Sequence, residues 1–398
     1  MAFSDSVAQI QKKLKEYSLD GWLLYNFRGV NPFASKILEM TSGKLSSRRY
    51  FYYIPASGTP QKLVHSIEQY DLDHLPGEKT IYNRWTTLHA GVKKLLGGAR
   101  KVCMEYSPNN DIPYLSKVDA GTLEFVRSFG VEVVSSGDIV QYFEARWSDE
   151  QYADAQTTAN ILLRTIDTAF NFIGERLRSG AKVTEYDVQQ LIMKEFEANQ
   201  LTTYAPANCS VNGNGANPHY DPSASHSAEI RKGDHILIDW WAKMKKPGAV
   251  YADFTWVGYA GKQVPAKYQE VFDIVKGARD AAVEHLRREF SAGRPVRGCD
   301  VDDVTRKHIE ERGYGQYFVH RTGHNIGEEV HGNGAHIDNF ETMDVREIIP
   351  ETCFSIEPGI YLPGEFGIRL EIDVYIGKNK EVILLGDRVQ DRIVTIDC

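Results

Sequence analysis

The chain has 398 residues and a formal net charge of −8 at pH 7, with 42% hydrophobic and 25% charged residues. This length exceeds what one hydrophobic core usually supports, so two domains are expected. The acidic balance argues against a nucleic-acid partner and against an anionic membrane surface, because both attract positively charged proteins.

Targeting and redox signals favour the cytoplasm. The first residues, MAFSDSVAQIQKKL, contain no apolar core of a signal peptide, and no later stretch approaches the roughly 18 apolar residues of a membrane span. The five cysteines are scattered and odd in number, which argues against a disulfide framework and a CxxC zinc site. We therefore expect a cytoplasmic protein.

The first part of the chain is predicted to form an α/β domain. Residues 7–14 place apolar side chains on one helical face. Runs rich in β-branched and aromatic residues then indicate strands, at residues 21–26, 48–54, 61–67, 101–106 and 131–136. Helical patterns near 84–97 and 115–128 separate the later runs, and no phosphate-loop signature occurs.

A domain boundary is predicted near residues 144–151, which gives domains of 1–146 and 147–398. Ser148 followed by Gln151 is a capping-box pattern, which marks the start of a helix. Apolar residues at helical spacing then continue this helix: Leu162, Ile166, Ala169, Ile173 and Leu177.

The second domain has the same order of predicted elements twice. Helices near 149–178 and 184–199 precede strands that run to about residue 260. Helices near 266–289 and 300–312 precede a second set of strands that runs to the end of the chain. This order predicts a pseudo-symmetric α+β domain with a site between its halves.

Each half contains one hairpin signal with two acidic residues at matched positions. Asp239 and Asp253 are 14 positions apart around a Pro-Gly turn, and so are Glu357 and Glu371. In a symmetric antiparallel hairpin, residues equidistant from the turn lie opposite each other. We therefore expect Asp239 to face Asp253 and Glu357 to face Glu371.

These four carboxylates lie in apolar, strand-like sequence, so their mutual repulsion and their loss of hydration must be compensated. Protons, basic partners or metal cations can supply the compensating charge. Protons alone would hardly reconcile four convergent carboxylates, whereas divalent ions such as Mn²⁺, Fe²⁺ or Co²⁺ accept oxygen ligands readily. The alternative for any single acid is an exposed strand position or one half of an ion pair.

A histidine-rich stretch follows, with His320, His324, His331 and His336 among several glycines that allow close backbone approach. A neutral imidazole is the commonest metal ligand and a good proton shuttle. The absence of HExxH argues against a helix-borne zinc peptidase site.

At these residues the chain resembles the pita-bread (M24) metallopeptidases, the group that contains methionine aminopeptidase, aminopeptidase P and prolidase. The matching elements are Asp239 and Asp253 in a hairpin, TGHNIG with His324, EPGIY with Glu357 and RLE with Glu371. The resemblance implies that these five residues bind two divalent metal ions, manganese first, with cobalt, zinc or iron as alternatives.

The resemblance covers about residues 150–398 and implies a pita-bread fold with an internal pseudo-two-fold repeat. The preceding residues look like the smaller creatinase-like domain of aminopeptidase P, prolidase and creatinase, although no sharp motif occurs there. A homodimer is also expected.

Further roles follow from the resemblance. His219, in NPHY, matches a histidine near the scissile bond, and His331, in EVHG, matches one that binds the substrate carbonyl or the tetrahedral intermediate. His320 and Arg369 match residues near the subsite for proline or its carboxylate.

The implied activity is hydrolysis of the N-terminal peptide bond of short peptides with proline second, of the aminopeptidase P or prolidase type. Asp253 and Glu371 match the metal-bridging positions. A metal-activated water would attack the carbonyl, with Glu357 as proton shuttle.

Two alternatives stay open. Relatives on the same fold hydrolyse small non-peptide amides, and others only bind partners after losing metal ligands. Bulky residues beside the first two acids, Trp240, Trp241 and Trp256, depart from the family pattern and leave the substrate side chain undetermined.

Overall fold

The computed structural model describes residues 3–40 and 46–398. The chain divides into two compact units, Met1–Phe143 and Glu144–Cys398. Each unit has hydrophobic clusters of its own, such as that around Trp22 in the first and that around Trp240 in the second. Within the described ranges, no helix is both long and apolar enough to cross a bilayer.

The first unit is built on one six-stranded mixed sheet, in the order β4-β3-β2-β1-β5-β6. Its strands are β1 (Gly21–Asn26), β2 (Tyr50–Pro55), β3 (Gln61–His65), β4 (Glu78–Tyr82), β5 (Lys101–Met104) and β6 (Glu132–Ser135). Its α-helices are α1 (Phe3–Glu16), α2 (Pro32–Ile37), α3 (Trp85–Leu96), α4 (Ala120–Arg127) and α5 (Gly137–Glu144). Only β2 runs against its neighbours, so the other five strands end at the same edge.

All five strands predicted for this unit are confirmed, and the sequence patterns missed β4. Most side chains of β4 are exposed, because it lies at the edge of the sheet. An exposed edge strand needs no alternation of apolar residues, which is the signal that identified the other strands.

The second unit contains four long helices and a set of mostly antiparallel strands. The helices are α6 (Asp149–Arg178), α7 (Glu185–Ala198), α8 (Ala266–Ser291) and α9 (Gly298–Glu310). The strands are β7 (Leu201–Thr202), β8 (Asn208–Val211), β9 (His235–Met244), β10 (Ala252–Tyr259), β11 (Asn325–Ile326), β12 (Cys353–Ile356), β13 (Gly359–Leu362), β14 (Phe366–Arg369), β15 (Ile372–Ile376), β16 (Val382–Leu384) and β17 (Val394–Thr395).

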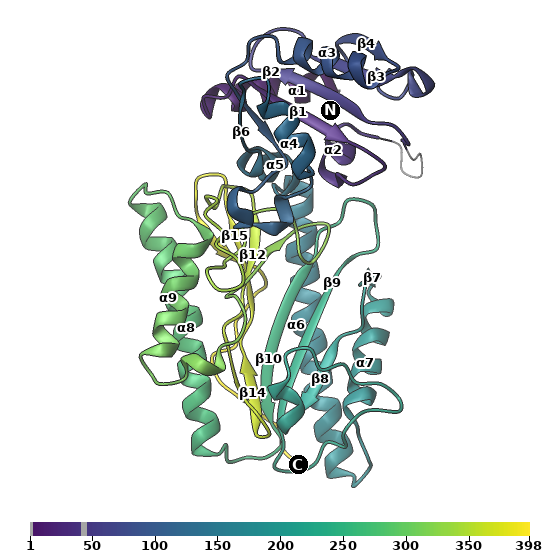
Figure 1. Ribbon diagram of the computed structural model, residues 1–398. Helices are drawn as coiled ribbons and strands as arrows, with labels where there is room; N and C mark the ends of the chain where they lie inside the picture. Colours follow the sequence, from purple (N-terminus) through teal and green to yellow (C-terminus); the bar gives the residue numbers. More distant parts are fainter. Residues whose placement is uncertain (1–2, 41–45) are drawn as a thin grey trace. The chain divides into compact units, whose positions relative to one another are not determined.

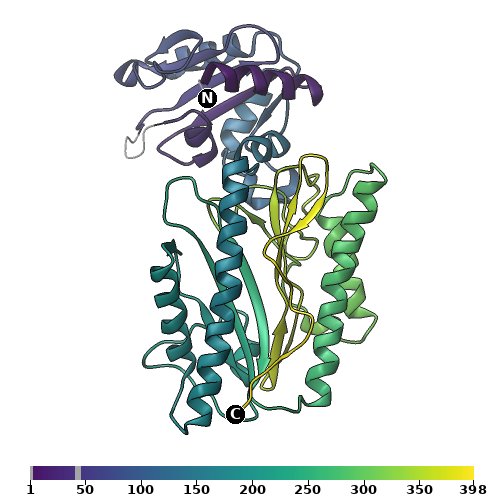
Figure 2. The ribbon, with the colours of Figure 1, turned by 180° about the vertical axis from the view of Figure 1, so that it is seen from behind.

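This unit has the predicted repeat of helix, helix and strands. In Figures 1 and 2, α6 and α7 lie beside β8–β10, whereas α8 and α9 lie beside β12, β14 and β15. In the first half, Leu162 and Ile166 of α6 share a buried cluster with Ile238 of β9. In the second half, Leu286 of α8 shares another with Phe354 of β12. The pseudo-symmetric α+β architecture is therefore confirmed.

The start of α6 follows from its sequence. Ser148 accepts the backbone N–H of Gln151 at 3.1 Å, and the Gln151 side chain accepts the N–H of Ser148 at 2.9 Å. This reciprocal pair satisfies two donors that a helix N-terminus leaves free. The capping box predicted here is confirmed.

Strand β9 separates two faces by simple alternation. Ile238 and Trp240 are fully buried against α6, and the indole N–H of Trp240 donates to the Leu162 carbonyl at 3.1 Å. Asp239 and Trp241 point to the opposite face, because successive side chains of a strand alternate. The acids are therefore presented on the side of the strands away from α6.

The pairing predicted between Asp239 and Asp253 is wrong by two residues. Asp253 lies opposite Trp241, and Asp239 lies opposite Thr255. The register is centred on Pro247, one residue beyond the centre that equal spacing assumed, and a one-residue shift of the centre moves each partner by two. Because two is the side-chain period of a strand, both acids still lie on the same face.

Candidate metal centre

The first two acids come from the long β9–β10 hairpin, together with Thr255. The Thr255 hydroxyl lies 3.2 Å from Asp239 Oδ1 and 2.7 Å from Glu371 Oε2. It also accepts the Nε–H of Arg369 at 2.9 Å. One threonine thus connects acids from both halves of the unit.

The other two acids lie where the second hairpin is interrupted. Glu357 follows the end of β12, and Glu371 precedes β15, whose Ile372 pairs with Ile356. The register of β13 with β14, which pairs Gly359 with Arg369, is the one predicted from the spacing of the acids. Glu371 forms a bridge with Thr255 instead of a long ladder, which joins the two halves at the acids.

His324 reaches the acids through a segment held against β12. The backbone N–H of His324 donates to the Ser355 hydroxyl at 3.0 Å, and the N–H of Ser355 donates to the His324 carbonyl at 2.8 Å. A Cβ atom at Gly323 would lie 1.9 Å from the Ser355 carbonyl oxygen, so only glycine permits this approach.

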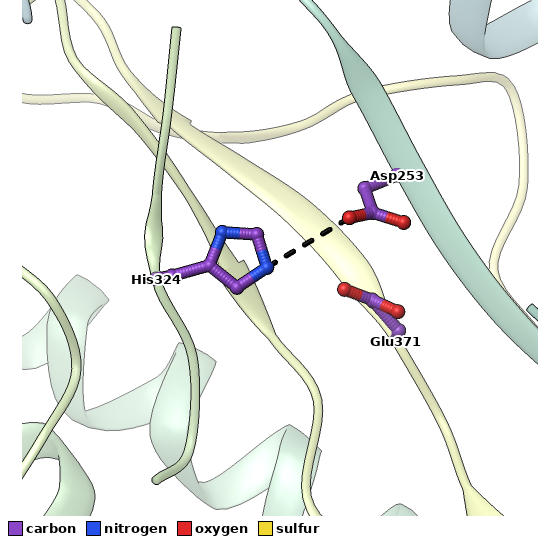
Figure 3. A group of neighbouring side chains, drawn as sticks. All are labelled: Asp253, His324 and Glu371. Atoms are coloured by element: carbon purple, nitrogen blue, oxygen red, sulfur yellow. Dashed lines mark ion pairs between the residues drawn. The ribbon is translucent and has the colours of Figure 1, made fainter. Parts of the chain in front are cut away.

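Asp253, His324 and Glu371 point toward one another, with one ligand atom from each within 4.8 Å of the others (Figure 3). Nε2 of His324 is 3.7 Å from Asp253 Oδ2 and 3.4 Å from Glu357 Oε1. Asp239 contacts the Thr255 hydroxyl and is paired with Arg369. All five predicted ligands therefore lie in one cluster.

Burial makes this cluster electrostatically costly. It raises the pKa of Asp253 and of Glu371 well above the usual carboxyl range, and the neighbouring carboxylates add to both shifts. Burial also raises the pKa of Glu357 to about 7. For the same reason the pKa of His324 lies well below its usual value, which keeps the imidazole neutral with a lone pair to donate.

Arg369 is a cation within ion-pair distance of three of these acids. It pairs with Asp239, and its Nε lies 3.8 Å from Glu357 Oε2 and 4.0 Å from Glu371 Oε2. One guanidinium cannot balance four carboxylates.

The donor set fits divalent metal ions. It contains four carboxylates and one neutral imidazole, which are ligand types that manganese, cobalt, iron and zinc accept. Within the described residues, Oδ1 of Asp253 is buried and has no hydrogen-bond partner. A buried carboxylate oxygen without a donor needs a cation, and a bound metal would meet this need.

A cavity of about 340 Å³ opens on the cluster, and a neighbouring one measures about 530 Å³. His219, His331 and Arg369 line both, whereas His320 lines only the second. The ring of His331 lies 4.3 Å from that of His324 in an edge-on arrangement. Four side chains assigned to catalysis or substrate binding thus surround the predicted ligands.

His320 is fixed by Tyr361. Nε2 of His320 lies 2.8 Å from the Tyr361 hydroxyl, which also accepts from Arg369 at 3.3 Å. Burial lowers the pKa of His320 to about 3, so its ring is neutral. The fourth histidine of this stretch, His336, lines neither cavity and accepts the N–H of Asn325 at 3.0 Å.

Sequence reasoning missed three residues of this site. Thr255 and Tyr361 fix Arg369, and Asp373 accepts the backbone N–H of Asp253 at 2.8 Å. Thr255 and Asp373 each lie two positions from a predicted ligand, and this alternation is the signal that could have identified them.

The three tryptophans behave differently. Trp240 is in the core, and Trp256 packs under the Arg388 guanidinium, whose Cζ is 5.2 Å from the ring centroid. Only Trp241 lines the cavity, with Tyr204 at 5.9 Å between ring centroids. Trp241 is therefore the member of this set that can contact a bound molecule.

The sequence profile of metallopeptidase family M24 matches residues 157–378. A Xaa-Pro dipeptidase of Lactobacillus delbrueckii subsp. lactis is 32% identical over 209 residues, which are 52% of this chain and 51% of that relative. The chain thus spans about half the length of this relative.

Two crystal structures resemble the whole chain. The dipeptidase PepE from Mycobacterium ulcerans has a TM-score of 0.68 at 20% identity, covering 99% of this chain and 98% of its own. An X-prolyl aminopeptidase from Caenorhabditis elegans, described as a cytosolic enzyme with a di-nuclear active site, has a TM-score of 0.62 at 16% identity, covering 99% of this chain and 63% of its own. At these identities the likeness shows the fold.

Proposed function

Because the chain belongs to metallopeptidase family M24, we propose that it hydrolyses the N-terminal peptide bond of short peptides and prefers proline at the second position. The observation that carries this proposal is the convergence of four carboxylates and a neutral histidine on one cavity. The Xaa-Pro dipeptidase relative supports the preference for proline.

Two divalent metal ions would be held between the halves of this unit. Asp253, His324 and Glu371 would hold one ion, with Glu357 beside them. Asp239 would contribute to the second, with Asp253 and Glu371 shared between both. When bound, the metals supply a water of lowered pKa and polarise the scissile carbonyl.

The chain's own residues have separate tasks in this reaction. Glu357, which lies 3.4 Å from Nε2 of His324 and lines the cavity, would accept a proton from the attacking water and return it. Burial lowers the pKa of His331 to about 4, so its ring is neutral, and the one N–H of a neutral imidazole can donate a hydrogen bond to the developing oxyanion. His219 lines the same cavity and can protonate the leaving nitrogen.

The proline subsite is proposed at His320 and Arg369, which line the second cavity. Both are hydrogen-bonded to the Tyr361 hydroxyl, so the subsite would be rigid before a peptide binds. The Arg369 guanidinium can hold Asp239 or grip a substrate carboxylate.

The metal assignment is tested by Asp253→Ala and Glu371→Ala. Either change should abolish activity and lower the metal content, because each acid serves both ions. The exposed Asp273→Ala is the control. Metal content by mass spectrometry and peptide cleavage are measured on the same samples. Full activity in either site variant would overturn the assignment.

The substrate is tested with Ala-Pro, Ala-Pro-Ala and Ala-Ala-Ala on the wild type and Arg369→Lys. A preference for proline that disappears in the variant supports the subsite, because lysine cannot reproduce the planar fork of arginine. Equal rates on all three peptides contradict the preference. No cleavage despite bound metal would favour a hydrolase of small non-peptide amides, and absent metal would favour a binding protein.

Three further properties stay proposals. Manganese is proposed as the metal because oxygen ligands dominate the cluster. The cytoplasm is proposed because all five cysteines are free. A homodimer is proposed from the resemblance to the family, and the mass of the protein in solution tests it.

A further inference from the structure

The first unit contains a cavity of about 960 Å³ to which the peptidase reaction gives no role. It lies where β1, β3 and β4 end and where α3 and α4 begin. Binding sites of open α/β sheets form at the carboxyl ends of the strands, because loops and helix starts gather there. The place in the fold is thus one that suits a ligand.

Four cations line this cavity: Arg48, Arg49, Arg84 and Lys117. Within the described part of the chain, none of the four side chains has an ion pair. Uncompensated like charges in one concave site repel one another and favour an anion there. This concentration of positive charge is unusual in a chain whose net charge is −8.

The nearby acids are already engaged. Among the described residues, Asp119 is the only carboxylate in the lining, and both of its oxygens accept from Thr122, at 2.9 and 2.8 Å. Glu68 lies close by and accepts from Ser47 and from the backbone N–H of Arg48, at 2.5–2.9 Å. Neither acid pairs with a cation of the cavity, so the guanidinium groups remain able to bind an anion.

Aromatic rings form a second part of the lining. Trp85 is 68% exposed, and its ring lies 5.4 Å from that of His89, which in turn lies 4.3 Å from that of Phe125. Phe27 is also exposed at this cavity. A large exposed indole beside arginines offers a surface on which a flat ring can stack.

We propose that this cavity binds a small organic anion that combines a flat ring with a phosphate or carboxylate group. The arginines would hold the anionic group through charge-assisted, bidentate hydrogen bonds, and Trp85 would stack on the ring. The volume suits one such molecule. A polyanion such as nucleic acid is disfavoured, because the acidic balance of the chain would repel it.

The proposal is tested by calorimetry with two anionic probes and their neutral counterparts. Adenosine monophosphate is compared with adenosine, and indole-3-acetate with indole-3-acetamide; inorganic phosphate tests the anion alone. We expect one anionic ring compound to bind, and its neutral counterpart and phosphate to bind at least about tenfold more weakly, which is the effect of losing one charge-assisted hydrogen bond. The phosphate and carboxylate probes distinguish the two anionic groups.

Variants assign the binding to this cavity. Arg49→Ala combined with Arg84→Ala should weaken binding by about tenfold or more. The control combines Lys93→Ala with Arg100→Ala, which removes two exposed charges of the same unit outside the cavity. Trp85→Ala should weaken the binding of the ring compound and leave the binding of phosphate unchanged. Thermal unfolding verifies that each variant is folded.

The anionic probes could also bind at the metal centre, because phosphate and carboxylate groups bind metals. A further variant therefore distinguishes binding in the cavity from binding at the metal centre. Asp253→Ala should leave binding of the anionic probe unchanged. Loss of binding in Asp253→Ala, equal loss in the control pair, or equal affinity for charged and neutral probes would each overturn the proposal. The proposed peptidase activity does not enter this test.

Discussion

His331 illustrates how one residue can serve the reaction without holding the metals. Its ring packs edge-on against His324 and lines the cavity, and burial lowers its pKa to about 4. We predict that His331→Ala keeps its metals and loses about 10²–10³-fold in kcat, because a donor to a developing oxyanion acts mainly in the transition state. Steady-state kinetics and metal analysis check this.

The half-buried His285 on α8 gives the matched control, since His285→Ala removes the same ring outside the cavity. A collapse of metal content in His331→Ala would contradict the division of roles. It would make His331 a ligand.

Two neighbouring tryptophans permit a sharper test at the same scale. Trp241 lines the cavity beside Tyr204, whereas Trp240 is fully buried against α6. We predict that Trp241→Ala changes the preference for the first side chain of the peptide, with larger residues gaining rate, because the wall of the cavity recedes. A library of Xaa-Pro peptides measures this.

Trp240→Ala should instead cost about 3–5 kcal/mol of stability and leave the preference unchanged, because it removes a buried ring and its hydrogen bond to Leu162. Equal preferences in Trp241→Ala and the wild type would show that the indole does not contact the substrate.

At the scale of elements, the register of the two hairpins shows what the sequence can and cannot predict. Spacing alone placed the two acids of each hairpin on one face of that hairpin, because the side-chain period of a strand is two. It did not identify the partner of Asp253, since Lys245–Ala249 can form turns centred on different residues. It also could not show that the second hairpin is interrupted at Glu357 and Glu371, where Glu371 bridges to Thr255 and the Glu357 N–H donates to the Thr322 carbonyl.

Helix α9 provides a positioning element that no sequence pattern indicated. The fully buried Asp302 accepts from the backbone N–H of Thr322 at 2.9 Å and from its hydroxyl at 2.5 Å, and it pairs with Arg306 at 3.2 Å. Thr322 lies two residues before His324. Asp302 therefore fixes the segment that carries a predicted ligand.

We predict that Asp302→Ala lowers the free energy of unfolding by about 3–5 kcal/mol, because it leaves Arg306 without its buried partner. Metal affinity should also fall, as the His324 segment loses its anchor. The adjacent Asp303→Ala, which removes only a surface contact with Asn339, is the control. Denaturant unfolding and metal titration measure both effects; unchanged metal affinity would contradict the positioning role.

For the whole molecule, periodicity predicted seven helices and their order, because amphipathic helices depend on local sequence, but it missed the short helices α2 and α5. The repeat in the second unit followed from this order without visible identity between its halves. The edge strand β4 was not predicted, because most of its side chains are exposed. The cavity of the first unit was not predicted either, because its cations are distant in sequence and come together only in the fold.

The response of stability to pH and metal also belongs to the whole molecule. Burial raises the pKa of Glu357 to about 7 in the folded protein. A group of this kind stabilises the fold fully below its unfolded pKa of about 4.3, and this contribution is lost as the pH rises through the folded value. We therefore predict that metal-free Glu357→Gln, which cannot ionise, gains stability relative to the metal-free wild type between pH 5 and pH 8.

Metal reverses this difference. Because bound ions replace the protons, added Mn²⁺ should raise the melting temperature of the wild type more at pH 8 than at pH 5.5. The rise in melting temperature of Glu357→Gln on adding Mn²⁺ should be smaller. Thermal unfolding with EDTA and with Mn²⁺ across this range measures both trends. The exposed Glu310→Gln should follow the wild type throughout. A difference between metal-free Glu357→Gln and metal-free wild type that does not change with pH would show that Glu357 keeps an ordinary pKa in the metal-free protein.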